Sequence, residues 1–103
     1  MKKERRPPHI KNLFATIREC IAKGKYMPSM HATVRCKERG ITLSEILYVL
    51  KNGYHEQEKS SFDEAEFAWK YAIRHKIEFN DIRIIIAFKD GVLHIITVMH
   101  VTK

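Results

Sequence analysis

The spacing of apolar residues changes once along this chain, at Gly53, and the change constrains the class of fold. Before Gly53 the apolar residues recur at the helical spacing of three and four, and after it they alternate as in β-strands. The pattern predicts helices over residues 9–23, 30–39 and 43–51, a polar edge strand over 54–59, and strands over 67–77, 82–88 and 92–101. We therefore predict an α+β domain with three N-terminal helices packed on one face of a three- to four-stranded antiparallel sheet.

Local signals mark where the predicted helices and strands end. Gly40 lies where a left-handed C-terminal cap is needed, and Thr42 with Glu45 can form the capping box of the next helix. Ser29 can cap the helix that follows it. Between the last two strands, Asp90-Gly91 is typical of a tight hairpin turn. These signals place the joint between the second and third helices at Gly40.

Positive charge is concentrated in the first part of the chain. The 103 residues carry a net charge of +7, and residues 1–40 hold eleven Lys or Arg against three Asp or Glu. Such a surplus favours partners rich in phosphate or carboxylate groups. We interpret residues 1–8 as a basic flexible arm and residues 9–103 as a single domain, because two prolines separate the arm from the first apolar repeat.

Several classes of protein are disfavoured by what the sequence lacks. The two cysteines, Cys20 and Cys36, form no C-x-x-C pattern, and the chain has no motif for a metal ligand set, a nucleotide-binding loop or a nucleophilic elbow. No apolar run reaches the roughly 18 residues of a membrane span. The expectation is a cytoplasmic protein that uses no metal and no cofactor and does not enter a membrane.

Basic side chains are the candidate functional groups. Cleaving RNA without a metal needs cations that offset the phosphate charge, a base for the 2′-hydroxyl proton and an acid for the leaving oxygen. We assign Lys59, Lys70 and Arg83 to phosphate stabilisation, His31 or His100 to proton transfer, and Arg35, Arg39 and Arg74 to RNA binding. On a helix, residues 31, 35 and 39 share one side, and on a strand residues 70 and 74 share one face.

Two resemblances extend this interpretation. The motif H-x3-R-x3-RGI begins at His31, is followed by I-x2-VLKNG at residues 46–53, and IITV stands at residues 95–98. In these residues the chain resembles a bacterial domain family of unassigned function that is grouped with RelE/ParE-like toxin and ribonuclease folds. That resemblance implies a RelE/ParE-like toxin fold.

The second resemblance covers nearly the whole chain and is weaker at each position. Its residues are Pro8-His9, Gly24-Lys25, Gly40-Ile41, Lys59-Ser60, Trp69 with Arg74, and the closing hairpin. In these the chain is similar to the MqsR family of toxin endoribonucleases, which implies metal-independent cleavage of messenger RNA and a cognate antitoxin. Lys59 falls where that family has a functional lysine, whereas the family's third-strand tyrosine has no match near Arg83. Its last functional lysine would correspond to Met99 or His100, with Lys103 just beyond as a further RNA contact.

The leading hypothesis is a small toxin-like, metal-independent endoribonuclease, an mRNA interferase of a toxin–antitoxin system, that holds RNA on a basic face of its sheet. Its expected partners are RNA and an antitoxin protein. The alternative is a non-catalytic module that binds nucleic acid or an acidic protein on the same fold. In a third interpretation, His31, Arg35 and Arg39 are structural and hold a helix against the sheet.

Overall fold

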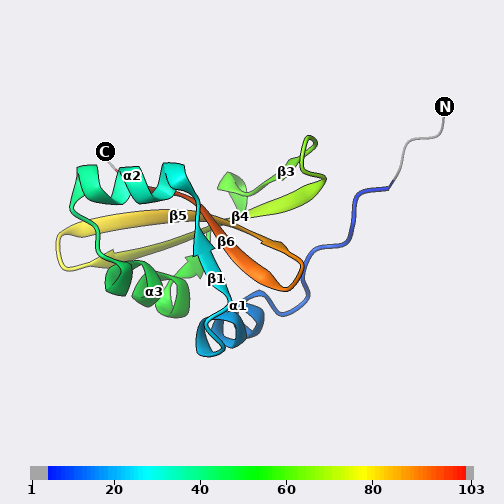
Figure 1. Ribbon diagram of the computed structural model, residues 1–103, viewed down its shortest axis with the longest axis horizontal. Coiled ribbons are helices and arrows are strands. Elements are labelled where there is room, and N and C mark those ends of the chain that lie inside the picture. The colour runs from blue at the N-terminus through cyan, green and yellow to red at the C-terminus, as the bar shows by residue number, and fades with distance from the viewer. Residues whose placement is uncertain (1–4, 102–103) are drawn as a thin grey trace.

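The computed structural model describes residues 5–101, which form three α-helices, a short 3-10 helix and six strands (Figure 1). In chain order these are α1 Leu13–Ala22, β1 Tyr26–Pro28, α2 Met30–Arg39, α3 Leu43–Asn52, β2 Tyr54–His55, η1 Gln57–Lys59, β3 Ser61–Asp63, β4 Ala68–Ile77, β5 Asn80–Lys89 and β6 Val92–His100. The predicted second helix has the observed bounds, and the predicted third helix ends one residue early. None of the helices in the described part of the chain is long and apolar enough to cross a membrane.

The sheet is larger than the sequence predicts. Its strand order is β1-β6-β5-β4-β2, with β3 also paired to β4. The long strands β4, β5 and β6 are antiparallel, whereas β1 pairs with β6 in parallel. The prediction of a three- to four-stranded antiparallel sheet is therefore wrong, because the sheet is mixed and six-stranded, although the class is still α+β.

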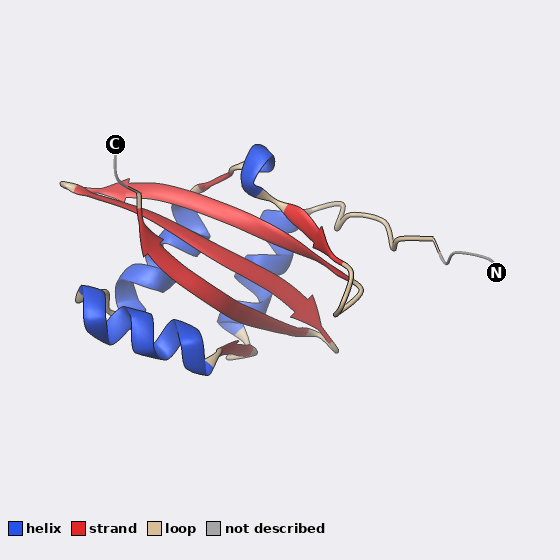
Figure 2. Cartoon of the chain, turned by 90° about the horizontal axis from the view of Figure 1, so that it is seen from above, coloured by secondary structure: helices blue, strands red, loops and turns tan. Residues whose placement is uncertain are grey.

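The helices are distributed around this sheet, and only two of them cover a face. α1 and α3 lie behind the long strands in Figure 2, and their buried side chains pack against strand residues such as Ile73, Ile84 and Val98. α2 lies alongside β6, near the edge formed by β1. We call the face covered by α1 and α3 the helix face and the other the opposite face. The even-numbered residues 68–74 of β4 belong to the opposite face, as the alternation of apolar residues predicts.

Both helix ends that the sequence predicts around Gly40 are confirmed. Gly40 has the left-handed φ of 67° that ends α2. At the start of α3, the Thr42 side chain accepts from the Glu45 backbone N–H while the Glu45 side chain accepts from the Thr42 backbone N–H. Ser29 caps α2 by accepting from Ala32 N, and its hydroxyl also donates to the carbonyl of Ile96 on β6. One serine thus ties the start of α2 to the sheet.

The outer edge of β4 is interrupted at its centre. β2 pairs with Ile73 and Arg74, and β3 pairs with residues 68–70, so residues 56–60 leave the sheet between the two. The backbone of Ala72 is still fully bonded, because its carbonyl accepts from Glu56 N at 2.8 Å and its N–H donates to Ser60 Oγ at 3.0 Å. At this interruption, side chains from residues 55–60 can contact the edge of β4 directly.

An extended N-terminal segment lies over the start of β4. The carbonyl of Pro7 accepts from the Trp69 indole N–H at 2.7 Å, and Ile10 N donates to the Tyr71 hydroxyl at 3.0 Å. Arg6 forms an ion pair with Glu64 at 2.7 Å. Residues 5–8, the described part of the predicted basic arm, therefore contact the domain, and residues 1–4 lie outside the described residues.

Candidate functional site

Three of the predicted functional cations share the opposite face of the sheet. Arg74 on β4 and Arg83 on β5 are direct partners in the antiparallel register, and Lys70 lies four residues, or two repeats of the strand alternation, before Arg74 on β4. Sequence alternation thus places these side chains correctly. Lys59 is not among them, because it is exposed at the end of η1.

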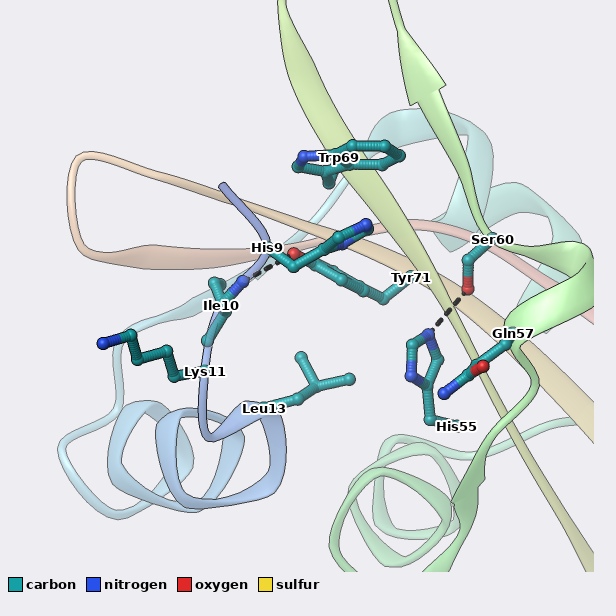
Figure 3. A pocket seen from close by; sticks show the side chains of 9 residues that line it. All are labelled: His9, Ile10, Lys11, Leu13, His55, Gln57, Ser60, Trp69 and Tyr71. Carbon is teal, nitrogen blue, oxygen red and sulfur yellow. Dashed lines mark hydrogen bonds between the residues drawn. The ribbon is translucent and has the colours of Figure 1, made fainter. Parts of the chain in front are cut away.

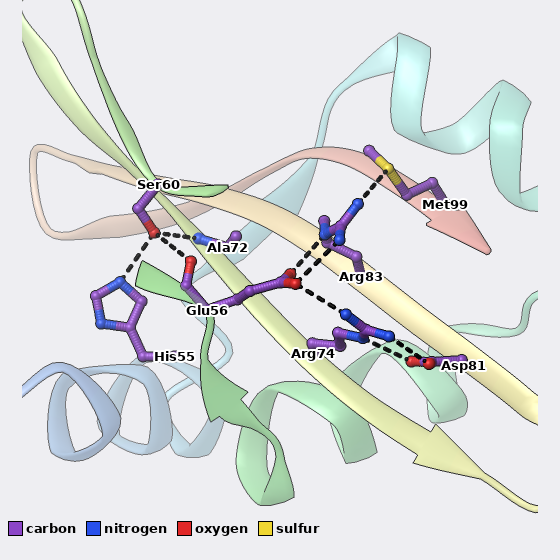
Figure 4. Close-up of polar contacts among 8 residues, drawn as sticks. All are labelled: His55, Glu56, Ser60, Ala72, Arg74, Asp81, Arg83 and Met99. Atoms are coloured by element: carbon purple, nitrogen blue, oxygen red, sulfur yellow. Dashed lines mark hydrogen bonds and ion pairs between the residues drawn. The ribbon is translucent and has the colours of Figure 1, made fainter. Parts of the chain in front are cut away.

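These cations are paired with carboxylates (Figure 4). Glu56, only 3% exposed, accepts from Arg83 Nε at 2.6 Å and from Arg74 Nη1 at 2.9 Å. Arg74 also reaches Asp81 at 2.7 Å, and Lys70 reaches Asp63 at 3.0 Å. The hydrogen bonds from Arg83 and then Arg74 hold the pKa of the Glu56 carboxyl below its usual value in spite of burial.

The opposite face is consequently a closed ion-pair network, with its positive charge largely offset. A phosphate approaching Arg74 or Arg83 would have to displace a buried carboxylate, which is unfavourable. This network therefore stabilises the sheet, and its arginines are not free to bind the phosphate of a substrate. Sequence patterns do not reveal this network. Glu56 contacts the arginines only because residues 56–60 leave the sheet edge between β2 and β3.

The remaining predicted residues are spread along the β1 side of the molecule. His31, Arg35 and Arg39 lie on α2, and Arg35 makes an ion pair with Glu38 at 3.4 Å. His100 ends β6 and pairs in register with Ile82. Lys103 lies outside the described residues. The structure brings Arg74 and Arg83 together, but it does not gather Lys59, Lys70, Arg83, His31 and His100 into one site.

A cavity of about 560 Å³ lies on the helix face beside the interrupted edge (Figure 3). Its walls come from the N-terminal segment and the start of α1, from β2 and the residues that follow it, and from β4. The lining residues are His9, Ile10, Lys11, Leu13, His55, Gln57, Ser60, Trp69 and Tyr71. We call this cavity the histidine pocket. It contains two imidazoles, an amine, a phenol, a hydroxyl and an amide, and none of its lining residues is Asp or Glu.

The two imidazoles flank the ring of Tyr71. The His9 ring stacks on Trp69 with 3.8 Å between ring centroids and lies 6.0 Å from the Tyr71 ring. The His55 ring meets the Tyr71 ring edge-on at 5.5 Å. Tyr71 itself is 2% exposed and lines the pocket, and its hydroxyl accepts from Ile10 N, so this bond does not use the hydroxyl's own hydrogen. The buried phenol thus fixes the spacing between the two imidazoles.

Hydrogen bonds orient the His55 ring. Its Nε2 lies 2.9 Å from Ser60 Oγ, which already accepts from Ala72 N and donates to the Glu56 carbonyl at 3.2 Å. With the serine hydrogen so used, His55 donates through Nε2, and Nδ1 is the nitrogen without a hydrogen. Figure 3 shows this second nitrogen directed into the pocket. Burial, and secondly the charge of His9, lower the pKa of His55 below its ordinary value, so the neutral form prevails at neutral pH.

The histidine pocket therefore offers acid–base chemistry next to positive charge. Lys11 forms no ion pair within residues 5–101, in contrast with Lys70, Arg74 and Arg83. Across that same part of the chain, no three His, Cys, Asp or Glu residues are grouped as ligands for a metal ion. An anion can thus enter beside two imidazoles without meeting a carboxylate.

Sequence reasoning did not identify this pocket. The helix predicted over residues 9–23 includes His9, yet α1 begins at Leu13 and His9 lies in an extended segment. The polar edge strand predicted over residues 54–59 contains His55 and stops short of Ser60, and the proximity of these two residues depends on the interrupted pairing of β4. The one signal in the sequence is that residues 69 and 71 share a face of the predicted strand over 67–77, which by itself does not indicate a pocket.

Fold and site together define an α+β domain with a mixed six-stranded sheet and a carboxylate-free pocket at one sheet edge. Residues 28–100 match the family described as Domain of unknown function (DUF4258), and the chain belongs to that family. This match contains the H-x3-R-x3-RGI motif and confirms the resemblance to a family of unassigned function; it does not support a RelE/ParE-like or MqsR-type assignment. The comparison with curated proteins found no match. His55, Ser60 and Tyr71 lie inside the matched region, and His9 and Lys11 precede it.

Proposed function

We propose that this protein is a metal-independent endoribonuclease that cleaves RNA in the histidine pocket. The observation that carries the proposal is the placement of two imidazoles, His9 and His55, on the same buried phenol in a pocket with Lys11 and without a carboxylate. Two imidazoles and a cation meet the needs of phosphodiester cleavage by a neighbouring hydroxyl: a base, an acid and a group that offsets charge. This proposal keeps the reaction predicted from sequence and moves its site.

In this mechanism His55 is the general base. Its Nδ1 takes the proton of the 2′-hydroxyl, the 2′-oxygen attacks phosphorus, and the bond from phosphorus to the 5′-oxygen breaks. His9, as imidazolium, gives its proton to the leaving 5′-oxygen. The products are a 2′,3′-cyclic phosphate and a 5′-hydroxyl end, so atoms and protons balance without water or a metal ion. The lowered pKa of His55 keeps the base unprotonated at neutral pH.

Three further groups of the pocket can stabilise the charge that develops on the phosphate. Lys11 supplies an ammonium group, Gln57 an amide N–H, and Tyr71 its hydroxyl hydrogen. The Ser60 hydroxyl acts indirectly, because it orients the His55 ring rather than facing the phosphate. Removing one such donor typically costs an enzyme about 10²-fold to 10³-fold in rate.

The test is cleavage of a single-stranded RNA by the purified full chain in the presence of EDTA. We expect cleavage by the wild type and a loss of at least about 100-fold in His55→Ala, since positioned acid–base groups contribute about 10²-fold to 10⁴-fold. His31→Ala is the matched control, because His31 lies on α2 and does not line the pocket. Thermal unfolding of each variant shows whether a loss of rate reflects a loss of fold.

Two outcomes would contradict the proposal. If His31→Ala or His100→Ala abolishes cleavage while His55→Ala retains it, the residues predicted from sequence carry the reaction. If the wild type binds RNA with a steep salt dependence but leaves it intact, the protein is the non-catalytic binding module of the alternative hypothesis. The antitoxin partner remains a prediction from sequence.

A further inference from the structure

A second cavity, of about 450 Å³, lies on the opposite face at the start of β4. A smaller cavity of about 210 Å³ has walls in common with both this cavity and the histidine pocket. It shares Trp69 and Tyr71 with the histidine pocket and Phe67 and Phe88 with the second cavity. The three cavities are therefore neighbours at the end of the sheet where β4 begins, and residues 67 and 71 are separated by about 13 Å at 3.3 Å per residue.

Aromatic rings contact one another at this end of the sheet. His9 stacks on Trp69, Trp69 meets Phe62 at 5.0 Å, and Phe62 meets Phe67 at 5.3 Å. Phe67 has a positive φ of 51° and is 40% exposed. A left-handed backbone is costly for a bulky side chain and is found where the surroundings or a function require it. In this conformation Phe67 lines the second cavity as well as the smaller one.

Glu66 and Lys89 line the same cavity as Phe67 and form only a long ion pair with each other. Glu66 Oε1 lies 4.0 Å from Lys89 Nζ, and both side chains are more than 60% exposed. The neighbouring pair Lys70 and Asp63 is different, because its atoms are 3.0 Å apart and its side chains are mostly buried. Glu66 and Lys89 therefore remain available to a ligand, and they offer it one acceptor and one donor side by side.

We propose that the second cavity binds a guanine base of the RNA substrate. Guanine presents the O6 acceptor next to the N1–H and N2–H donors along one edge, which complements Lys89 next to Glu66. The base can stack on Phe67, as unpaired bases commonly stack on exposed aromatic rings. Adenine presents an amino donor in place of O6 and fits the pair less well. The inference rests on the proposed function and specifies which sequence would be cleaved.

The test is an NMR titration of the full chain with 5′-GMP and, separately, with 5′-AMP. We expect 5′-GMP to shift the amide signals of Phe67, Ala68 and His94, which line or adjoin the cavity, and to bind about ten-fold more tightly than 5′-AMP. Glu66→Ala should remove this preference, and Phe67→Ala should weaken both nucleotides by about five-fold or more. Glu58→Gln, an exposed change on η1, is the matched control and should alter neither.

Equal affinity for the two nucleotides, or amide shifts confined to other surfaces, would overturn the inference. Cleavage is scored separately, so the two proposals can fail separately. Binding of 5′-GMP at Phe67 in a protein that leaves RNA intact would support the subsite and contradict the nuclease. Cleavage with no preference for guanine, and unchanged in Glu66→Ala, would support the nuclease and contradict the subsite.

Discussion

At the scale of the residue, the sequence His55-Glu56-Gln57 connects the two polar regions of the molecule. His55 and Gln57 line the histidine pocket, whereas Glu56 between them points to Arg74 and Arg83 on the opposite face (Figures 3 and 4). Neighbouring side chains of an extended chain point in opposite directions. Glu56 is therefore a positioning residue, because its ion pairs hold the segment that carries His55.

Replacing Glu56 tests this arrangement. Glu56→Gln should lower the free energy of unfolding by about 3–5 kcal/mol, because it leaves the largely buried guanidinium group of Arg83 without a paired carboxylate and that of Arg74 with Asp81 alone. Denaturant unfolding at neutral pH measures the loss. Since the pKa of Glu56 is lowered in the folded protein, its contribution is present above the usual glutamate pKa and disappears as pH falls through the folded value.

The control for this change is Glu58→Gln. Glu58 is exposed and forms no ion pair within residues 5–101, so its replacement should alter the unfolding free energy by less than about 0.5 kcal/mol. An equal loss in the two variants, or a difference between wild type and Glu56→Gln that persists in strong acid, would show that the network does not stabilise the fold through its charge.

At the scale of the element, the α3–β2 junction depends on a glycine for reasons of space. Gly53 has ordinary backbone angles, with φ of −80°, yet a Cβ there would lie 2.6 Å from the Arg74 carbonyl oxygen and 2.7 Å from that of Val49. Both are backbone atoms and cannot rotate away. The close approach of α3 to β4, which sets where β2 and His55 lie, is possible only without a side chain at this position.

Gly53→Ala should therefore lower the free energy of unfolding by about 1–3 kcal/mol, because the added methyl group overpacks a contact that has no free space. Gly24→Asn is the control: Gly24 has a φ of 70°, which asparagine tolerates, and nothing lies within 4 Å of its added Cβ. Thermal unfolding of both variants measures the difference. A Gly53→Ala protein as stable as the wild type would contradict the close approach of α3 and β4.

The elements differ in how well the sequence predicts them. Helix ends at Ser29, Gly40 and Thr42 depend on side chains a few residues away, so local patterns were sufficient. β1 and β3 have three residues each, and β1 ends in a proline, so neither shows a recognisable alternation. β1 pairs with β6, far away in the sequence, which no local pattern contains. β3 pairs with the next strand, β4, but it is too short to be distinguished from a connection.

At the scale of the whole molecule, the histidine pocket is assembled from distant parts of the chain. The N-terminal segment contributes His9, and the interrupted edge of β4 contributes His55 and Ser60. Sequence correctly placed the cations of the opposite face on one side of the sheet, but it could not show that carboxylates neutralise them. Nor could it show that two histidines 46 positions apart meet at Tyr71.

The central claim is that His9 and His55 act together as acid and base in one pocket. The most direct measurement is the single-turnover cleavage rate of a short RNA, in EDTA, for the wild type, His9→Ala, His55→Ala and the double variant. Groups that act as a unit are not additive, so each single variant should lose at least about 100-fold and the double variant little more. Full activity in either single variant, or losses that simply multiply in the double variant, would contradict the account.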